Sequence, residues 1–125
     1  MRLTELTAMI VRLRLRKEFK HASFNRTWSD NFLVRCRLAD GTIGWGEGIP
    51  RPYVTGESPE GSMEQIASTD LRSQLGNDCT TWSDVLDLCT NYQPAIMQVD
   101  PRGCLSNAHR CAVELSIFDA FGKLF

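Results

Sequence analysis

The chain has 125 residues, of which 42% are apolar and 23% charged, and its formal net charge is −1. These proportions are those of a globular protein and exclude a disordered or collagen-like chain, and no apolar run is long enough to span a membrane. A chain of this length forms one domain and is too short for a (β/α)₈ barrel, which takes about 250 residues. Because residues 1–6 lack the basic and then apolar layout of a signal peptide, we expect a cytoplasmic protein.

The charges are divided unevenly along the chain. Residues 1–51 carry ten Lys and Arg against five Asp and Glu, whereas residues 52–125 carry four against ten. A nucleic-acid-binding domain is basic throughout and has a high isoelectric point, so this composition argues against a nucleic-acid partner. The division instead indicates two layers, or two interfaces, of opposite charge.

Two segments in the first half alternate between apolar and charged residues, as a strand with one buried face does. The first, residues 9–16, has apolar side chains at odd positions and arginine between them. The second, residues 32–38, has apolar side chains at even positions and Arg35 and Arg37 between them. A hairpin turn at Asp40-Gly41 and a third strand to about Gly48 follow. The sequence therefore predicts a three-stranded antiparallel meander over about residues 3–48.

The connection between the first two strands, Lys17 to Asp30, is long and polar, and a loop of this length is often functional. Within the third strand, alternation places Ile43, Trp45 and Glu47 on the inner face. Glu47 is then a buried acid that needs a partner, and a structural role is favoured over a place in a site at the domain edge. The nearby glycines match no phosphate-binding spacing and indicate close packing: Gly41, Gly44, Gly46 and Gly48.

The second half predicts about three helices over residues 59–125. Ser58-Pro59 has the N-cap and first-turn residues of a helix start, and an apolar stripe runs from there to a stop at Gly76. Thr81 opens a shorter helix that ends near residues 91–94. Strands followed by helices define an α+β fold with the helices on one face of the sheet. The last helix is expected to bury one apolar stripe: Ala108, Cys111, Ala112, Leu115 and Phe118.

The cysteines and histidines predict neither a disulfide framework nor a metal site. The five cysteines are odd in number and no pair has the CxxC spacing, so reduced, buried cysteine is favoured. Cys36 falls on the apolar face of a strand and Cys111 on that of a helix. His21 and His109 are far apart and share no ligand spacing, so no metal ligand is assigned within the chain.

Five arginines of the first two strands are expected on one face of the meander: Arg12, Arg14, Arg16, Arg35 and Arg37. Such a face supports an alternative function, a free-standing α+β binding module for RNA or anionic ligands. Binding of single-stranded RNA, however, needs aromatic side chains on the same face, and alternation puts the aromatic residues of these strands on the other. A solvated or subunit-facing surface is therefore favoured.

Residues 49–57, IPRPYVTGE, form a restrained segment between the last strand and the first helix. Its two prolines stiffen it and Gly56 permits a sharp bend. It offers an arginine, a phenol and a hydroxyl that could bind a carboxylate or line a pocket, although an ordered connector explains it equally well. Glu57, Glu60 and Glu64 fit acids that complement a helix dipole. Because no Ser/His/Asp or Cys/His arrangement is present, no catalytic residue is assigned within the chain.

Three stretches stand in a recognisable order: residues 41–48 (GTIGWGEG), 53–60 (YVTGESPE) and 108–123 (AHRCAVELSIFDAFGK). Together they resemble the amino-terminal capping domain of the enolase superfamily, in the branch of mandelate racemase and muconate lactonizing enzyme. The resemblance covers the chain from about Leu6 onward and departs at Cys111 and Phe118, where alanine and tryptophan are common. Residues 51–57 are most similar to muconate cycloisomerase-like and dipeptide epimerase-like members.

This resemblance implies a function. In the superfamily the cap packs on a modified barrel that carries lysine bases and three carboxylates holding Mg²⁺ or Mn²⁺, and the metal stabilises the enolate formed when a proton next to a carboxylate is removed. The chain would be the substrate-specificity cap of such an isomerase or cycloisomerase, inactive without the barrel. Its partners would be its own C-terminal barrel domain, a small carboxylate substrate and further copies in a homo-oligomer, with no nucleic acid and no membrane.

The resemblance also implies two loops that close over the barrel mouth, exclude water and shape specificity. The first lies in the long connection, at His21, Ser23 and Phe24. The second loop offers four candidate residues, of which the middle two are the strongest: Ile49, Arg51, Tyr53 and Thr55.

The apolar end of the chain predicts a boundary inside a larger protein, which a reading frame that stops at Phe125 would contradict.

Overall fold

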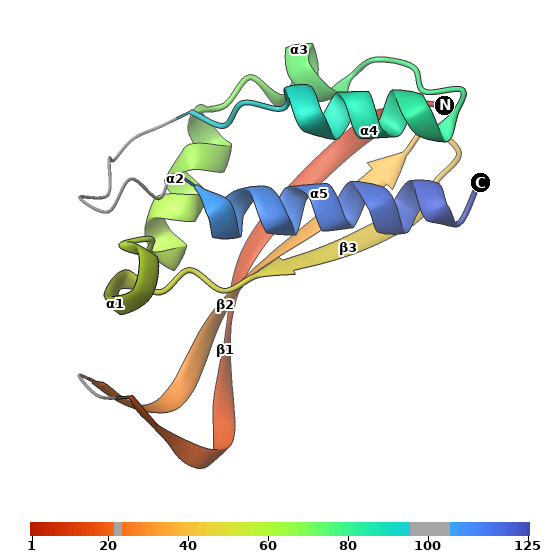
Figure 1. The fold of residues 1–125 in the computed structure, drawn as a ribbon. Coiled ribbons are helices and arrows are strands. Elements are labelled where there is room, and N and C mark those ends of the chain that lie inside the picture. The colour runs from red at the N-terminus through yellow and green to blue at the C-terminus, as the bar shows by residue number, and fades with distance from the viewer. Residues whose placement is uncertain (22–23, 96–105) are drawn as a thin grey trace.

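The computed structural model describes residues 1–21, 24–95 and 106–125 of the chain. Three antiparallel strands form one sheet in the order β1-β2-β3, with β1 at Leu3–His21, β2 at Phe24–Leu38 and β3 at Ile43–Gly48. The helices pack on one face of this sheet, with α5 running along it and the far half of the β1–β2 hairpin projecting beyond them (Figure 1). The predicted meander and α+β class are confirmed.

Five helical segments follow the sheet rather than about three. The stripe expected to continue from Ser58 to Gly76 is broken, because Thr69 is extended (φ −89°, ψ 133°) and the side chain of Asp70 caps a new helix by accepting from the amide of Ser73 at 3.2 Å. Local capping therefore ends one helix and starts the next within two residues. The segments are α1 (Pro52–Thr55), α2 (Pro59–Ser68), α3 (Leu71–Leu75), α4 (Trp82–Asn91) and α5 (Asn107–Gly122).

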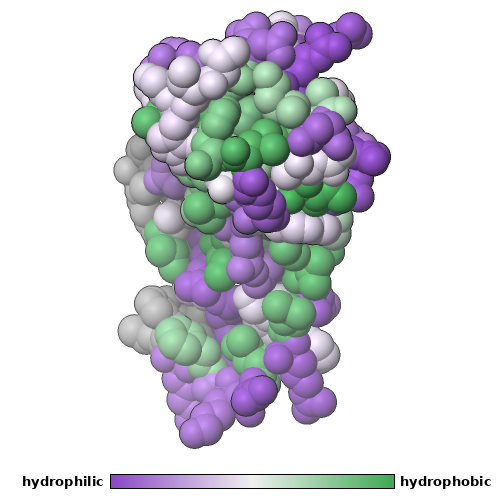
Figure 2. All heavy atoms as spheres, turned by 90° about the vertical axis from the view of Figure 1, so that its right-hand side faces the viewer, coloured by the Kyte–Doolittle hydropathy of each residue, from purple (hydrophilic) through white to green (hydrophobic). Residues whose placement is uncertain are grey.

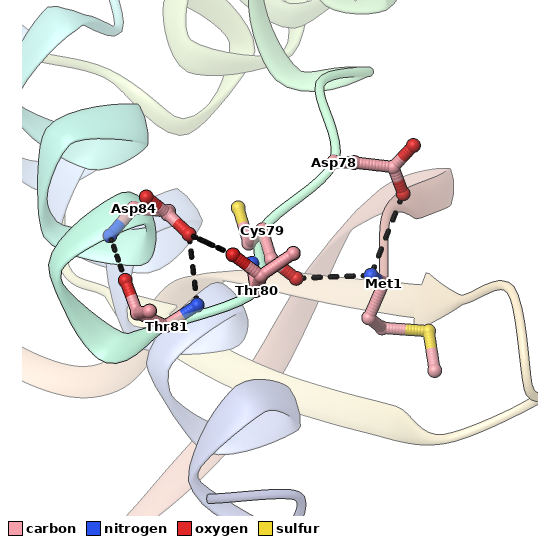
Figure 3. A network of polar contacts seen from close by, with 6 residues as sticks. All are labelled: Met1, Asp78, Cys79, Thr80, Thr81 and Asp84. Atoms are coloured by element: carbon pink, nitrogen blue, oxygen red, sulfur yellow. Dashed lines mark hydrogen bonds and ion pairs between the residues drawn. The ribbon is translucent and has the colours of Figure 1, made fainter.

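The predicted start of α4 at Thr81 is confirmed by a capping box. The Thr81 hydroxyl accepts from the amide of Asp84 at 3.3 Å, and the Asp84 carboxylate accepts from the amides of Thr80 and Thr81 at 2.7 and 2.8 Å. These amide hydrogen bonds lower the pKa of Asp84 to about 2. Next to this box the Met1 amino group donates to the carbonyl of Cys79 at 2.9 Å, so the start of β1 is joined to the segment before α4 (Figure 3).

The expected loop from Lys17 to Asp30 is wrong, because both strands continue through it. Phe19 pairs with Arg26 and Lys20 with Asn25, after a shift in register that follows Arg14. A hairpin ladder depends on main-chain bonds, so polar side chains on two solvated faces do not prevent it. Hydrophilic residues gather at this projecting end of the molecule (Figure 2).

The register divides the five arginines expected on one face. Arg12 stands opposite Asp30, in the row that includes the Ile10–Phe32 pair and faces the helices, whereas Arg35 stands opposite Trp45 on the outer face. Since β1 has apolar residues at both odd and even positions between 8 and 13, its alternation could not show which set faces the core, and a slip of one residue reverses every side chain. Trp45 therefore shares a face with Arg35, contrary to the expectation.

The glycines of β3 carry the contact with α5, and the expected inner residues Ile43, Trp45 and Glu47 are exposed instead. A Cβ on Gly46 would lie 2.0 Å from the carbonyl oxygen of Ala112, and the contacts of Gly44 and Gly48 are equally close. Two strand residues advance about 6.6 Å and four helix residues about 6 Å, so each successive glycine of the strand meets the next helical turn. The face without side chains is buried because only there can a helix backbone approach.

Two side chains of α5 and that of its C-cap residue also bond the free edge of β3. The Lys123 ammonium donates to the carbonyl of Ile43 at 2.7 Å, and Asp119 accepts from the amide of Trp45 at 2.9 Å. The Cys111 thiol lies 3.7 Å from the carbonyl of Glu47. Residues 111, 119 and 123 therefore occupy the side of α5 that overhangs this edge.

The close approach also decides which side of α5 is buried. Cys111 and Leu115, expected in the buried stripe, are exposed. The small residues that contact β3 are the next ones in sequence, so a neighbouring face of the helix is buried instead. The cysteines at 36, 79 and 89 are buried and free, Cys111 is exposed and free, and Cys104 lies outside the described residues. In the described part of the chain no helix has the length and apolarity to cross a membrane. The buried residues of α5 are His109, Ala112, Val113, Ser116, Ile117, Ala120 and Phe121.

Candidate functional site

A pocket of 480 Å³ opens where the projecting half of β2 passes the segment from Pro50 to Glu60. One wall comes from the hairpin and the other from α1 and the start of α2. Arginine, tyrosine and tryptophan side chains line it together with two acids. The lining residues are Asn25, Arg26, Thr27, Trp28, Asp30, Pro50, Arg51, Pro52, Tyr53, Ser58, Pro59 and Glu60.

Strand geometry supplies the first wall. Even-numbered residues of β2 face the helices, so the buried row at 32–38 continues toward the hairpin end as Asp30, Trp28 and Arg26. The sheet extends past the helices here (Figure 1), and residues of β2 on the open part of its inner face line the pocket.

Turn chemistry supplies the second wall. Pro52 stands at the start of α1, where its missing amide and fixed φ cost nothing, and Gly56 ends the helix with a positive φ of 78°. The chain then turns into α2, whose N-cap Ser58 accepts from the amide of Gly61 at 3.0 Å. These three local signals set the turns of residues 51–60, which form the second wall of the pocket.

Arg26 joins the two walls. Its Nη1 donates to the Tyr53 hydroxyl at 2.9 Å, and its Nε donates to the carbonyl of Trp28 at 3.2 Å. The guanidinium carbon also lies 5.9 Å from the centre of the Tyr53 ring, within the range of a cation–π contact. Arg26 is only 9% exposed, so a permanent charge is held under the surface at this point.

Asp30 and Arg51 are two further charged residues that line the pocket. Arg12 donates two hydrogen bonds to the Asp30 carboxylate, at 2.8 and 2.9 Å, and these bonds lower the pKa of Asp30. The charge of Arg26 acts in the same direction, so Asp30 is ionised at neutral pH. The Nε of Arg51 is buried and finds no hydrogen-bond acceptor among the described residues. The pocket therefore contains a guanidinium with an unused donor.

Glu57 complements the dipole of a helix, as expected, but the helix is α5. Its Oε2 accepts from the amide of Ala108 at 2.8 Å, in the first turn of α5. The N-cap residue Ser106 makes no side-chain cap there, and its hydroxyl accepts from Gln65 instead. A carboxylate at this position stabilises the positive end of the helix and ties the segment after α1 to α5.

Glu47 lies outside the pocket, and its expected burial is wrong. It is exposed on the outer face of the sheet and accepts a hydrogen bond from the side chain of Asn31, which in turn accepts from Ser29. Its burial was expected because the sequence pattern placed the odd-numbered residues of β3 on the inner face, whereas they lie on the outer face.

The residues proposed for the two loops have different positions. Arg51 and Tyr53 line the pocket. Ile49 is exposed before it, and Thr55 is half-buried in α1 without lining it. The backbones of His21 and Phe24 pair with each other near the hairpin end, whereas Ser23 lies outside the described residues. Their part in substrate recognition stays a prediction.

Sequence reasoning missed Arg26, Trp28 and Asp30 because they fell in the expected loop. A usable signal exists, since charged and aromatic residues at 26, 28 and 30 extend the even-numbered row of Phe32 toward the N-terminus. Alternation read backward from the buried strand would have placed them on the inner face.

His109 is buried for structural reasons. Its ring stacks against Phe32 and Tyr92, with centroids 5.7 and 5.9 Å away, and its Nε2 lies 2.7 Å from the Tyr92 hydroxyl. Burial lowers the pKa of His109 to about 4, so the ring is neutral at physiological pH. It lies on α5 and packs toward α2 and the end of α4, and it does not line the pocket.

Comparison with known sequences gives two curated relatives, while no family model matches the chain. The aromatic dipeptide epimerase of Herpetosiphon aurantiacus is 31% identical over 119 residues, which make up 94% of this chain and 30% of that enzyme. The N-succinyl-L-Arg/Lys racemase of Bacillus cereus is 24% identical over 123 residues, 98% of this chain and 31% of that enzyme.

Comparison with solved structures gives relatives of the same kind. A mandelate racemase/muconate lactonizing protein from Herpetosiphon aurantiacus has a TM-score of 0.72 and 30% identity, over 98% of this chain and 31% of its own. The L-Ala-D/L-Glu epimerase of Bacillus subtilis, complexed with substrate, has a TM-score of 0.78 at 20% identity, over 99% of this chain and 32% of its own.

The chain thus has the fold of the amino-terminal capping domain of the enolase superfamily. Its homologues and structural neighbours are enzymes of the mandelate racemase/muconate lactonizing branch, in agreement with the resemblance seen in the sequence. The chain spans slightly less than a third of the length of these relatives.

Proposed function

We propose that residues 1–125 form the substrate-specificity cap of a divalent-metal-dependent isomerase or cycloisomerase that removes a proton next to a carboxylate. The pocket between β2 and α1 carries this proposal, because it brings Arg26, Arg51 and Tyr53 from two distant stretches of chain to one opening. Guanidinium groups and a phenol are suited to hold a small carboxylate or an aromatic side chain. The names of the two curated relatives support dipeptides and N-acylated amino acids as the substrate class.

In this proposal the reaction chemistry belongs to a C-terminal barrel domain. Among the described residues no group of three or more His, Cys, Asp or Glu is placed to hold a metal ion, so this part of the chain does not fit a Mg²⁺ or Mn²⁺ site. Three structural neighbours are complexed with Mg and a dipeptide, which supports a metal in the enzyme as a whole. The cap binds and orients the substrate and excludes water.

The alternative, a free-standing binding module with an arginine face, is not supported, because the arginines do not share one face of the sheet. Arg12 and Arg35 lie on opposite faces of the sheet, and Arg35 is paired with Glu5. The cytoplasm as the compartment and a homo-oligomer as the assembly remain part of the proposal.

The test uses the full-length product of the gene that encodes this chain, supplied with Mg²⁺. Incubation in D₂O with a panel of L,L-dipeptides and N-succinyl amino acids, followed by NMR, measures exchange of the α-proton. We expect exchange with at least one substrate class, and we expect Arg51→Ala to change the ratio of kcat/KM between substrates with acidic and apolar side chains. Arg37→Ala, an exposed arginine on the outer face, is the matched control.

Two results would contradict the proposal. A gene product that ends at residue 125 rules out the cap of an isomerase or cycloisomerase, and one that exchanges no α-proton in the panel rules out an epimerase or racemase of these two substrate classes. An Arg51→Ala variant that lowers kcat/KM by the same factor for every substrate shows that the pocket does not contribute to specificity.

A further inference from the structure

The position of α1 needs an explanation, because the helix is short and exposed. It contains four residues, none of them buried, and its N-cap residue Arg51 makes no side-chain capping bond. Three main-chain bonds lie within the segment: the amides of Val54 and Thr55 donate to the carbonyl of Arg51 at 3.0 Å, and that of Gly56 donates to the carbonyl of Pro52 at 3.1 Å. A helix this short has no stability of its own in water. Contacts with the rest of the chain must place it.

Arg26 reaches α1 from the opposite wall. It donates to the Tyr53 hydroxyl at 2.9 Å with one guanidinium nitrogen and to the carbonyl of Trp28, on its own strand, at 3.2 Å with another. The second bond fixes the guanidinium against β2, so the first bond transmits the position of the strand to the helix. Because the donor is charged and nearly buried, this hydrogen bond is of the stronger kind.

Arg26 can donate to the Tyr53 hydroxyl because the carboxylate on the same face of β2 already accepts hydrogen bonds from another arginine. Asp30 accepts two hydrogen bonds from Arg12, which stands opposite it on β1. With that carboxylate engaged, the guanidinium of Arg26 is directed to the phenol.

We propose that Arg26 is a positioning residue that fastens α1 to β2 through Tyr53, so that the two walls of the pocket hold a fixed separation. The inference rests on the proposed function for its catalytic consequence, since there the pocket between the two walls binds the substrate. One wall then sets the position of the other, and neither can be exchanged alone without loss.

Hydrogen exchange in the full-length gene product tests the contact without substrate. In Arg26→Ala and Tyr53→Phe we expect the amides of Val54, Thr55 and Gly56 to exchange faster, on the order of tenfold or more, as follows from losing one charge-assisted hydrogen bond. Core amides of α5 keep their wild-type rates, which shows that the variants are folded. Arg26→Lys, which retains the charge, recovers part of the protection. Arg37→Ala is the control for loss of an arginine elsewhere.

A double variant distinguishes a direct contact from two independent effects. If Arg26 acts through Tyr53, Arg26→Ala combined with Tyr53→Phe accelerates α1 exchange little beyond Arg26→Ala alone. Multiplicative acceleration, or unchanged α1 exchange in either single variant, overturns the proposal.

Kinetics then separate this inference from the proposed function. We expect Arg26→Ala to raise KM several-fold more than it lowers kcat, because a wall that moves weakens binding of substrate before it affects the reaction itself. An enzyme with normal α1 exchange in every variant refutes the positioning role and leaves the cap function intact. Faster α1 exchange in the variants of a protein without activity supports the positioning role and contradicts the proposed cap function.

Discussion

Replacing Gly46 with alanine tests the glycine contact between β3 and α5 directly. The added Cβ would lie 2.0 Å from the carbonyl oxygen of Ala112 and 2.5 Å from the amide nitrogen of Ser116. Both are backbone atoms of a helix, so no side chain can rotate to make room. To restore an ordinary contact of 3.4 Å, the helix and strand must separate locally by about 1.4 Å.

The cost of this separation can be worked out from what α5 buries. Overpacking relieved by side-chain movement costs about 1–3 kcal/mol, and a gap of 0.5–1 Å already forfeits about a quarter to a half of each dispersion contact. The seven buried residues of α5 share the displacement. We therefore expect Gly46→Ala to lower the free energy of unfolding by about 4 kcal/mol, a large part of the roughly 5–15 kcal/mol available to a domain.

Urea denaturation followed by circular dichroism measures this effect. With a slope of about 2 kcal/mol per M, the midpoint falls by about 2 M. Gly122→Ala is the matched control, because a Cβ there meets nothing within 4 Å and alanine favours the helix. A Gly46→Ala midpoint within about 0.5 M of wild type would refute the argument that the missing side chain permits the approach.

Three further predictions concern single side chains. Because the pKa of His109 is lowered to about 4 in the fold, the unfolded chain binds the proton first, so stability falls as pH drops from about 6.5 toward 4; His109→Gln flattens this part of the pH profile, measured by urea midpoints. Of the four described cysteines, Cys111 should react fast with iodoacetamide in the native protein and the others slowly, since burial raises the pKa of Cys89 to about 12; equal rates in peptide mapping would contradict the burial pattern. Thr81→Ala removes the cap of α4 and should cost about 1 kcal/mol, with Thr90→Ala, exposed within the same helix, as the control.

The sequence predicts the order of elements well because local signals decide it. Ser58 and Thr81 begin helices as expected, and Asp40-Gly41 makes the turn into β3. The faces are predicted less well, because they depend on contacts between segments. Both rows of β1 are apolar near Ile10, so only the register with Phe32 shows which one is covered. On β3 the apolar side chains are the exposed ones, since a buried strand face can consist of glycine.

The candidate site was half predictable for the same reason. Arg51 and Tyr53 stand in a segment whose prolines and glycine mark a restrained turn, so their type and place are visible locally. Arg26 is not visible in this way, because its role depends on a strand that continues through polar sequence and on a helix 27 positions away. A buried arginine between polar neighbours resembles any solvated one until the opposite wall is known.

The bonds from α5 to the edge of β3 have a consequence for assembly. An unpaired edge strand is a template for another strand, and chains that expose one tend to aggregate. Here the ammonium of Lys123, the carboxylate of Asp119 and the thiol of Cys111 each engage one main-chain group of Ile43, Trp45 and Glu47, three alternate residues of the strand. A helix thus substitutes for the fourth strand of the sheet, and intermolecular pairing along β3 would first have to displace all three side chains.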